Sequence, residues 1–206
     1  MEKYEKTIDF KRDYRILVLE RTFNTVKYRI EEQEKHMNHV ERYSIAIGEA
    51  LGLTFLDLKD LALASNLHDI GKAFIDPKIL YKSKKLTKLE MEEIKKHPEI
   101  GGWLLKADER YRTLAKYVRH HHERWDGQGY PGGLKSEEIP LFSRIIAVAD
   151  AYDAMTTKRV YQKTKSRKEA VREILKNSGS QFDPKIAEIF VKKVLLRFTA
   201  SPTNTK

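Results

Sequence analysis

Apolar residues recur at three- and four-residue spacing along nearly the whole chain, which places them on one face of successive helices. Six Pro are present, and the Gly gather in the segment DGQGYPGG, so few positions would break a helix. No segment shows the strict apolar and polar alternation that a half-buried strand requires. The sequence therefore predicts an all-α fold, folded as a compact multi-helix bundle.

Capping residues predict where several helices begin. Thr54 precedes Asp57 by three residues, and the same spacing relates Thr87 to Glu90 and Ser166 to Glu169, as in capping boxes. Asp183 before Pro184 opens a last helix, and Gly52 ends an early one. An interruption is expected near His97, which precedes a Pro. Further helices are expected at about 108–124 and 141–155.

The chain divides into three predicted regions. Residues 1–30 form a charged, amphipathic helical lead-in, of the kind that connects to an upstream sensor module or forms a homodimer seam. Residues 31–197 form the catalytic domain. Residues 198–206 are polar and are expected to be a disordered tail.

Composition excludes several kinds of protein. With no Cys among 206 residues, the chain has no disulfide, no zinc knuckle and no thiolate nucleophile, so a metal would need His and carboxylate ligands. No stretch approaches the roughly 18 to 20 apolar residues of a membrane span, and the start lacks the apolar centre of a signal peptide. We therefore expect a cytoplasmic protein.

The formal net charge of +10 favours an anionic partner, such as a nucleotide, a nucleic acid or an acidic membrane surface. Many Lys alternate with Glu along helical stretches, however, which is also typical of solvated helix faces. Charge alone therefore does not identify the partner.

Histidines and aspartates occur where helices could bring them together. Asp150 shares a predicted helix stripe with Ser143 and Ile146, and a buried carboxylate costs several kcal/mol unless a cation compensates it. A single inward His is more often a hydrogen-bonded core residue than a ligand, so the joint occurrence carries the argument. The set is His39, His68, Asp69, His97, His121, His122 and Asp150.

These residues lie in segments that resemble the HD-GYP phosphohydrolases, a branch of the HD superfamily of metal-dependent phosphohydrolases. The segments are HVER, HDIGK, HPEIGG, HHERWDGQGYPGGL, RIIAVADAYDAMT and QFDPKI, within about residues 35–197. The resemblance implies an HD-type helical bundle with a buried metal site. It also implies hydrolysis of cyclic di-GMP to pGpG, and often onward to GMP, by a metal-activated hydroxide.

The resemblance also implies a role for each site residue. It places His39, His68, Asp69 and Asp150 on one ion and His97, His121 and His122 on a second, with Asp69 bridging the two. Lys72 would face the reacting phosphate and act with Asp69 in catalysis. The imidazole and carboxylate ligands suit two divalent transition-metal ions, with Fe or Mn favoured and Zn or Ni as alternatives.

Substrate contacts are expected from the Gly-rich loop and from one cation. Gly129 and Pro131 would let the backbone approach a flat ligand, and Tyr130 would offer a stacking face for guanine. Arg159 stands at the position that family members use to bind phosphate. Glu123 and Asp126 are expected to support the ligands from behind or to be structural, and His36 and His120 match no ligand position.

Two positions depart from the family pattern. Members with a third metal carry a Glu four residues before the first ligand His, and here, counted from His39, that position is Lys35. A two-metal site is therefore expected. The family's Arg-x-Tyr-Lys reads Arg159-Val160-Tyr161-Gln162, which puts a second phosphate contact in doubt.

The prediction is a metal-dependent phosphodiesterase for cyclic di-GMP, with no nucleic-acid polymer as partner. One alternative is hydrolysis of another cyclic dinucleotide or nucleotide phosphoester, because fold and ligands do not fix the substrate. Another is a domain that binds a nucleotide and signals without turnover.

Overall fold

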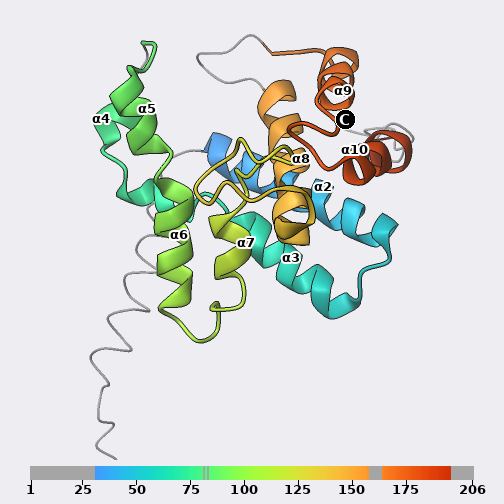
Figure 1. Cartoon of the computed structure of the whole chain (residues 1–206), viewed down its shortest axis with the longest axis horizontal. Coiled ribbons are helices and arrows are strands. Elements are labelled where there is room, and N and C mark those ends of the chain that lie inside the picture. The colour runs from blue at the N-terminus through green and yellow to red at the C-terminus, as the bar shows by residue number, and fades with distance from the viewer. Residues whose placement is uncertain (1–30, 81, 83, 158–163, 196–206) are drawn as a thin grey trace, which may run out of the picture.

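The computed structural model describes residues 31–80, 82, 84–157 and 164–195, and this part of the protein is helical (Figure 1). Within it there is no strand, and a single isolated bridge joins Ser178 to Phe182. The all-α prediction is confirmed. The α-helices are α2 (Glu31–Leu51), α3 (Phe55–Leu67), α4 (Pro77–Leu80), α5 (Lys88–Ile94), α6 (His97–Lys106), α7 (Ala115–Arg119), α8 (Leu141–Thr156), α9 (Arg167–Lys176) and α10 (Pro184–Ile189). Shorter turns are the 3-10 helices η1 (Ile70–Phe74) and η2 (Ser136–Glu138) and the π-helix η3 (Phe190–Val194).

The predicted lead-in at residues 1–30 and the predicted tail at 198–206 lie outside the described residues, as does Arg159. The domain boundaries therefore stay predictions. No helix in the described ranges is long and apolar enough to cross a membrane.

The predicted helix starts are confirmed by their hydrogen bonds. Complete capping boxes are formed by Thr54 with Asp57, by Thr87 with Glu90 and by Ser166 with Glu169. The Asp183 carboxylate accepts from the backbone N–H groups that open α10. Gly52 follows α2 with a φ of 78°, a left-handed conformation that Gly adopts at low cost.

The prediction of a helix at about 108–124 is wrong in the length of the helix. Only Ala115–Arg119 is α-helical, and turns lie on both sides of this helix, α7. Before it, backbone bonds span three residues, from Tyr111 N–H to the Asp108 carbonyl and from Leu114 N–H to the Tyr111 carbonyl. After it, the His121 ring takes the Val118 carbonyl that a longer helix would have used for its own backbone.

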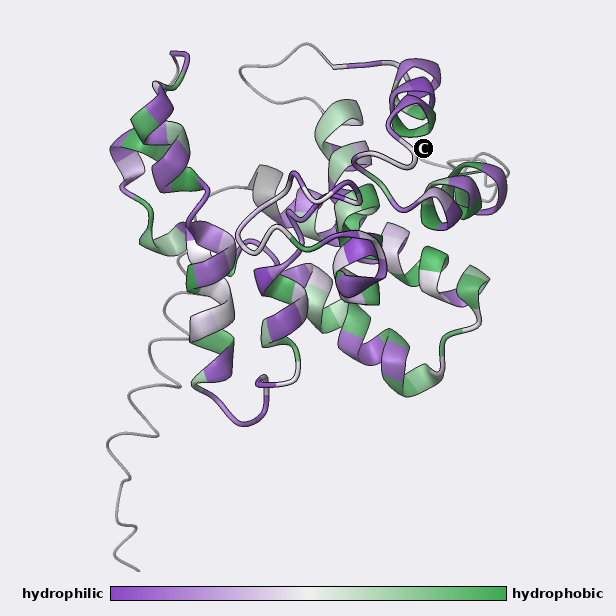
Figure 2. Cartoon of the chain, viewed as in Figure 1, coloured by the Kyte–Doolittle hydropathy of each residue, from purple (hydrophilic) through white to green (hydrophobic). Residues whose placement is uncertain are grey.

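The core lies where α2, α3 and α8 pack together. α2 contacts both α3 and α8, α9 and α10 pack against α8 (Figure 1), and η3 packs on α2 and α10. Apolar and polar segments alternate along most helices, so each presents an apolar face to its neighbours (Figure 2). Fully buried members of the core are Val40, Ile47, Leu61, Ala64, Ile145, Ile146, Ala149 and Phe190.

A close backbone contact joins η1 to α6. A Cβ built on Gly71 would lie 1.9 Å from the carbonyl oxygen of His97 and 2.8 Å from the backbone nitrogen of Gly101. A residue with any side chain would separate the two segments. Gly71 therefore lets the end of α3, with His68 and Asp69, lie directly against the start of α6.

We predict that Gly71→Ala destabilises the protein by at least about 1–3 kcal/mol, because the clashing atoms belong to the backbone and cannot rotate away. The matched control is Gly48→Ala in the last turn of α2, whose Cβ would meet only the side chains of leucines outside this helix. There the gain in helix propensity of about 1 kcal/mol offsets the crowding. Denaturant unfolding measures both changes, and equal midpoints for Gly71→Ala and the unmodified protein would contradict the close approach.

Candidate metal centre

Five segments bring imidazoles and carboxylates together at the centre of the bundle. They are the first turns of α2, the end of α3, the first turn of α6, the turn after α7 and the middle of α8. Two groups of side chains are close enough to hold cations, with ligand atoms that all lie within 4.8 Å of one another. One group is Asp69, His97, His121 and His122, and the other is His36, His68 and Asp69. Asp69 belongs to both.

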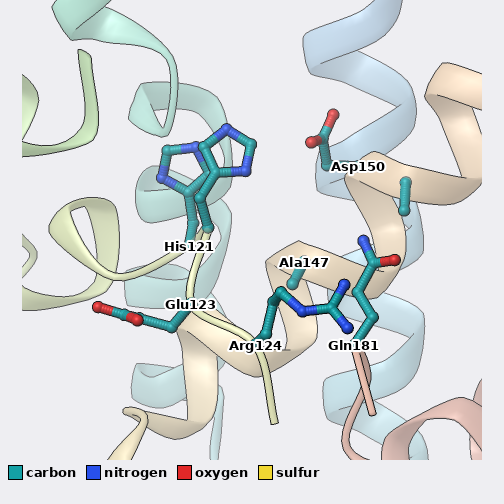
Figure 3. A pocket seen from close by; sticks show the side chains of 8 residues that line it. His121, Glu123, Arg124, Ala147, Asp150 and Gln181 are labelled. Carbon is teal, nitrogen blue, oxygen red and sulfur yellow. The ribbon is translucent and has the colours of Figure 1, made fainter. Parts of the chain in front are cut away.

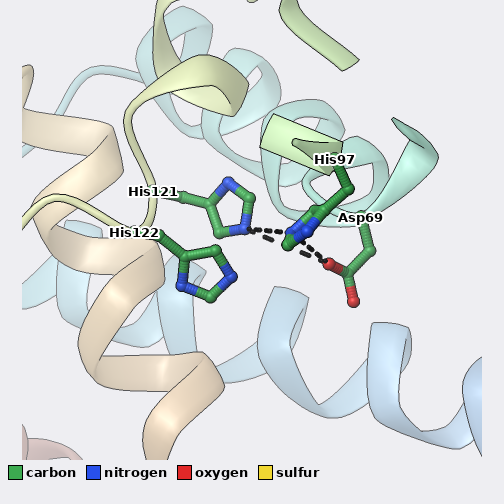
Figure 4. A group of neighbouring side chains, drawn as sticks. All are labelled: Asp69, His97, His121 and His122. Atoms are coloured by element: carbon green, nitrogen blue, oxygen red, sulfur yellow. Dashed lines mark hydrogen bonds and ion pairs between the residues drawn. The ribbon is translucent and has the colours of Figure 1, made fainter. Parts of the chain in front are cut away.

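In the first group, His97 and His121 point toward one oxygen of Asp69 (Figure 4). Asp69 Oδ1 lies 3.2 Å from His97 Nε2 and 4.0 Å from His121 Nε2. His97 and His121 are almost completely buried, and their Nε2 atoms are 3.4 Å apart. His122 lies beside them, with its ring centroid 5.0 Å from that of His97.

Backbone carbonyls fix the tautomers of three of these histidines. The Nδ1 atoms of His68, His97 and His121 lie 2.6–2.7 Å from the carbonyl oxygens of Ser65, Ile94 and Val118, each three residues earlier. A ring nitrogen that meets a carbonyl must carry the proton, so each neutral ring keeps an unshared electron pair on Nε2. These pairs point at Asp69 and at one another, an arrangement that needs a cation between them.

The second group lies on the other side of Asp69. His68, whose side chain is 0% exposed, has Nε2 3.4 Å from Asp69 Oδ2. His36 packs edge to face on His68, and its Nε2 is 3.3 Å from Asp150 Oδ1. Asp150 therefore joins this group through His36.

The structure places His36, rather than His39, beside the predicted ligands. His39 has 39% of its side chain exposed, and its Nδ1 contacts Asp153 Oδ1 at 2.7 Å. It is in neither group of the described residues that could hold a metal. The two histidines are three residues apart in α2, so both face α8, but only His36 lies deep enough to reach Asp150.

Asp153 is a residue that the sequence analysis did not single out. Its side chain is 1% exposed and accepts hydrogen bonds from His36 Nδ1 at 2.5 Å, from His39 Nδ1 and from the Thr157 hydroxyl. A carboxylate on the far nitrogen orients a ligand imidazole and raises its basicity. Its spacing of three residues from Asp150, on the same helix face, is the signal that could have identified it.

The electrostatics of the cluster favour the protonation states that bind metals. Burial lowers the pKa of His121 well below its usual value and that of His122 to about 4, so both rings are neutral at pH 7. Burial would raise the pKa values of Asp69 and Asp150. Instead, the cation of Lys72 lowers the pKa of Asp69, and a hydrogen bond from His36 lowers the pKa of Asp150. Both carboxyl groups are therefore ionised.

His36 behaves differently because two carboxylates face it. Burial alone would lower its pKa, but hydrogen bonds to Asp150 and Asp153 raise the pKa to about 9. In the metal-free protein His36 is therefore a cation at pH 7. A metal ion that binds His36 Nε2 replaces a proton at the same atom.

The remaining predicted site residues lie around the cluster. Lys72 Nζ is 2.6 Å from Asp69 Oδ2. The ring of Tyr130 stacks on His122, with centroids 5.0 Å apart, so that face is not free for a guanine. Gly129 packs so closely on the backbone of Glu123 and Arg124 that a Cβ would lie 2.3 Å from the Arg124 nitrogen. Pro131 follows Tyr130 in a cis peptide.

Glu123 and Asp126 have structural contacts, as expected. Buried Glu123 accepts a hydrogen bond from Gly132 N–H at 2.6 Å and faces His120 Nδ1 at 3.2 Å, which ties the Gly-rich loop to the turn after α7. Asp126 forms a two-point ion pair with Arg124. His120 lies in neither metal-binding group of the described residues.

The donor set fits divalent metal ions. His68 Nε2 and Asp69 Oδ1 are buried and have no hydrogen-bond donor in the described part of the chain. Unpaired buried polar atoms cost free energy, and a cation between them removes that cost. Imidazole nitrogens with carboxylate oxygens suit Fe, Mn, Zn or Ni better than Ca or Mg.

Comparisons with known proteins agree with this chemistry. A family model described as HD domain matches residues 15–186. A cyclic di-GMP phosphodiesterase of Thermotoga maritima is 40% identical over 182 residues, which cover 87% of this chain and 50% of that protein. A 3′3′-cGAMP-specific phosphodiesterase of Vibrio cholerae is 34% identical over 171 residues, which cover 82% of this chain and 33% of that protein.

The fold is similar to that of an HDGYP protein from Bdellovibrio bacteriovorus, with a TM-score of 0.66 at 19% identity, over 91% of this chain and 62% of that one. The chain spans half or less of the length of these two curated relatives.

We predict that Asp69→Asn lowers the bound metal by at least one ion per chain, because an amide removes the charge that both groups share. The matched control is Asp126→Asn, which lies outside both groups and should keep the full metal content. Elemental analysis of the two purified variants compares them directly. Full metal content in Asp69→Asn would show that the carboxylate is not shared.

A second pair of variants separates the two histidines of α2. His36→Ala should lower the metal content, since it removes a ring from the second group, while His39→Ala should retain most of it. Elemental analysis and circular dichroism of both variants check metal and fold together. The opposite ranking would restore His39 as the ligand.

Proposed function

The chain belongs to the HD domain family, as its HD-GYP motifs predicted, and from this premise we propose that it is a metal-dependent phosphodiesterase that hydrolyses cyclic di-GMP. The observation that carries the proposal is the pair of ligand groups that share Asp69. Metal ions bound there would supply Lewis-acid stabilisation of a phosphodiester and activation of the attacking water. The expected products are pGpG and, after a second cleavage, GMP.

The residues around the ligands have separate roles in this proposal. Asp69 holds negative charge between the two groups, and Lys72, which pairs with it, is positioned to offset the charge that grows on the phosphate oxygens. Asp153 orients His36 from the side opposite Asp150. Arg159 remains the proposed phosphate contact.

We propose two ions of Fe or Mn per chain, one for each group. The expectation of no third ion, which rests on Lys35 four residues before His39, stays a prediction. Counted from His36, the position four residues earlier is Glu32, a carboxylate in the same helix, α2. The second metal group therefore has an acidic residue one turn away in sequence.

Another cyclic dinucleotide is the second candidate substrate, because the Vibrio cholerae relative is named for 3′3′-cGAMP. The ligand groups would act on the shared phosphodiester in the same way for either substrate. The difference must therefore come from residues that contact the bases.

We predict that protein prepared without oxygen and loaded with Fe or Mn hydrolyses cyclic di-GMP, and that Asp69→Asn does not. Cyclic di-GMP, 3′3′-cGAMP and cyclic di-AMP are offered to the protein as competing substrates. Chromatography of the products then ranks the three by how fast each is cleaved. Fully metal-loaded protein that binds a cyclic dinucleotide and never cleaves it would instead support a signalling domain without turnover.

A further inference from the structure

A pocket of about 180 Å³ extends from the metal-binding cluster along α8 (Figure 3). Imidazoles of His121 and His122 and the carboxylate of Asp150 line it at the cluster. Ala147 and Ala151, one turn apart on α8, line it with small apolar side chains. Glu123, Arg124 and Gln181 line the rest, away from Asp150. A group held in this pocket would contact the metal ligands on one side and polar side chains, Arg124 and Gln181 among them, on the other.

The size of the pocket suits part of a dinucleotide. Pockets that enclose a whole small-molecule ligand measure roughly 300–1,000 Å³, so 180 Å³ is too small for the complete substrate. With a phosphate at the metal ligands, the part of the substrate that reaches Arg124 is a nucleoside. The small side chains of Ala147 and Ala151 leave room for the face of a base.

The hydrogen bonds of Arg124 leave one edge of its guanidinium free. Its Nε and Nη2 donate to the two oxygens of Asp126 at 3.1 and 2.7 Å. The guanidinium has five N–H donors in a fixed plane, so three remain, and one of Nη1 and one of Nη2 lie side by side at its end. No other residue in the described ranges accepts from these donors.

Two loops hold this edge in place. Trp125 N–H donates to the Gln181 carbonyl at 3.2 Å, and Asp126 N–H donates to the Ser180 carbonyl at 2.8 Å. The segment after α7 is therefore tied to the segment before α10, which brings Arg124 and Gln181 to the same pocket. The Gln181 side-chain amide makes no hydrogen bond within the described residues, and 32% of the Arg124 side chain is exposed.

We propose that Arg124, supported by Gln181, recognises the O6 and N7 edge of a guanine base of the substrate. The inference rests on the proposed function and adds the residue that selects the base. Guanine presents two adjacent acceptors on this edge, which match two parallel N–H donors, whereas adenine presents one acceptor and one amino donor. Adenine would set its amino group against an N–H of Arg124.

A base fits this site better than a second phosphate does. Asp126 already neutralises the charge of Arg124 through a two-point ion pair, so the attraction for an anion is weakened. Directional donors to neutral acceptors remain. Asp126 acts here as a positioning residue, because it turns the free end of the guanidinium toward the pocket.

The test uses Arg124→Ala and Arg124→Lys in the metal-loaded protein. Calorimetry measures the binding of GMP and AMP, and turnover gives kcat/KM for cyclic di-GMP and cyclic di-AMP. Arg124→Ala should weaken GMP binding and lower kcat/KM for cyclic di-GMP by about 5- to 150-fold, the worth of a two-point contact to guanine. Values for the adenine ligands should stay unchanged, and Arg124→Lys should not restore the loss.

The matched control is Arg119→Ala. Arg119 is also ion-paired, with Glu99, but does not line the pocket, so both nucleotide preferences should persist. Metal content and circular dichroism show that each variant is folded and loaded.

Three results would overturn the proposal. They are an equal loss for guanine and adenine ligands, full restoration by Arg124→Lys, which would indicate a phosphate contact, and no change in Arg124→Ala. Selective GMP binding that depends on Arg124, in a protein that cleaves no cyclic dinucleotide, would support the guanine site and refute the proposed function.

Discussion

The partly buried carboxylate of Asp69 is the group on which the rest of the site depends. Its two oxygens face different imidazoles, with His97 and His121 on one side and His68 on the other. Each of these three rings donates its Nδ1 hydrogen to a backbone carbonyl, so its Nε2 electron pair points inward. Such a set of acceptors is unfavourable without a cation, and this ties the stability of the centre to metal binding.

Close packing between particular helices brings the residues of this cluster together. Gly71 allows η1 to touch α6, and so brings Asp69 to His97. On the other side, α8 contributes Asp150 and Asp153 one turn apart, and both carboxylates hold His36 of α2. The same α8 lines the pocket that leads to Arg124 and Gln181. One helix thus connects the metal ligands to the surface that would select a base.

Much of the fold and the site could be predicted from the sequence because caps and motifs are local signals. Thr54, Thr87 and Ser166 form the boxes that their spacing indicated. His36 and His39 show the limit, since they are three residues apart and both contact Asp153, so only depth of burial distinguishes them. The short length of α7 could not be predicted either, because it depends on the His121 ring taking a backbone carbonyl that would otherwise continue the helix. No sequence pattern pointed to Arg124, because its proposed role depends on a loop 57 residues later, at Gln181.

The central claim is that Asp69 lies between two cations, one of which is held by His36. Anomalous diffraction from crystals grown with Mn or Fe tests it most directly, because it locates each ion among its ligands. The account predicts one peak among Asp69, His97, His121 and His122, and another among Asp69, His36, His68 and Asp150. A single peak, or a second peak bound by His39 with His36 uninvolved, would contradict it.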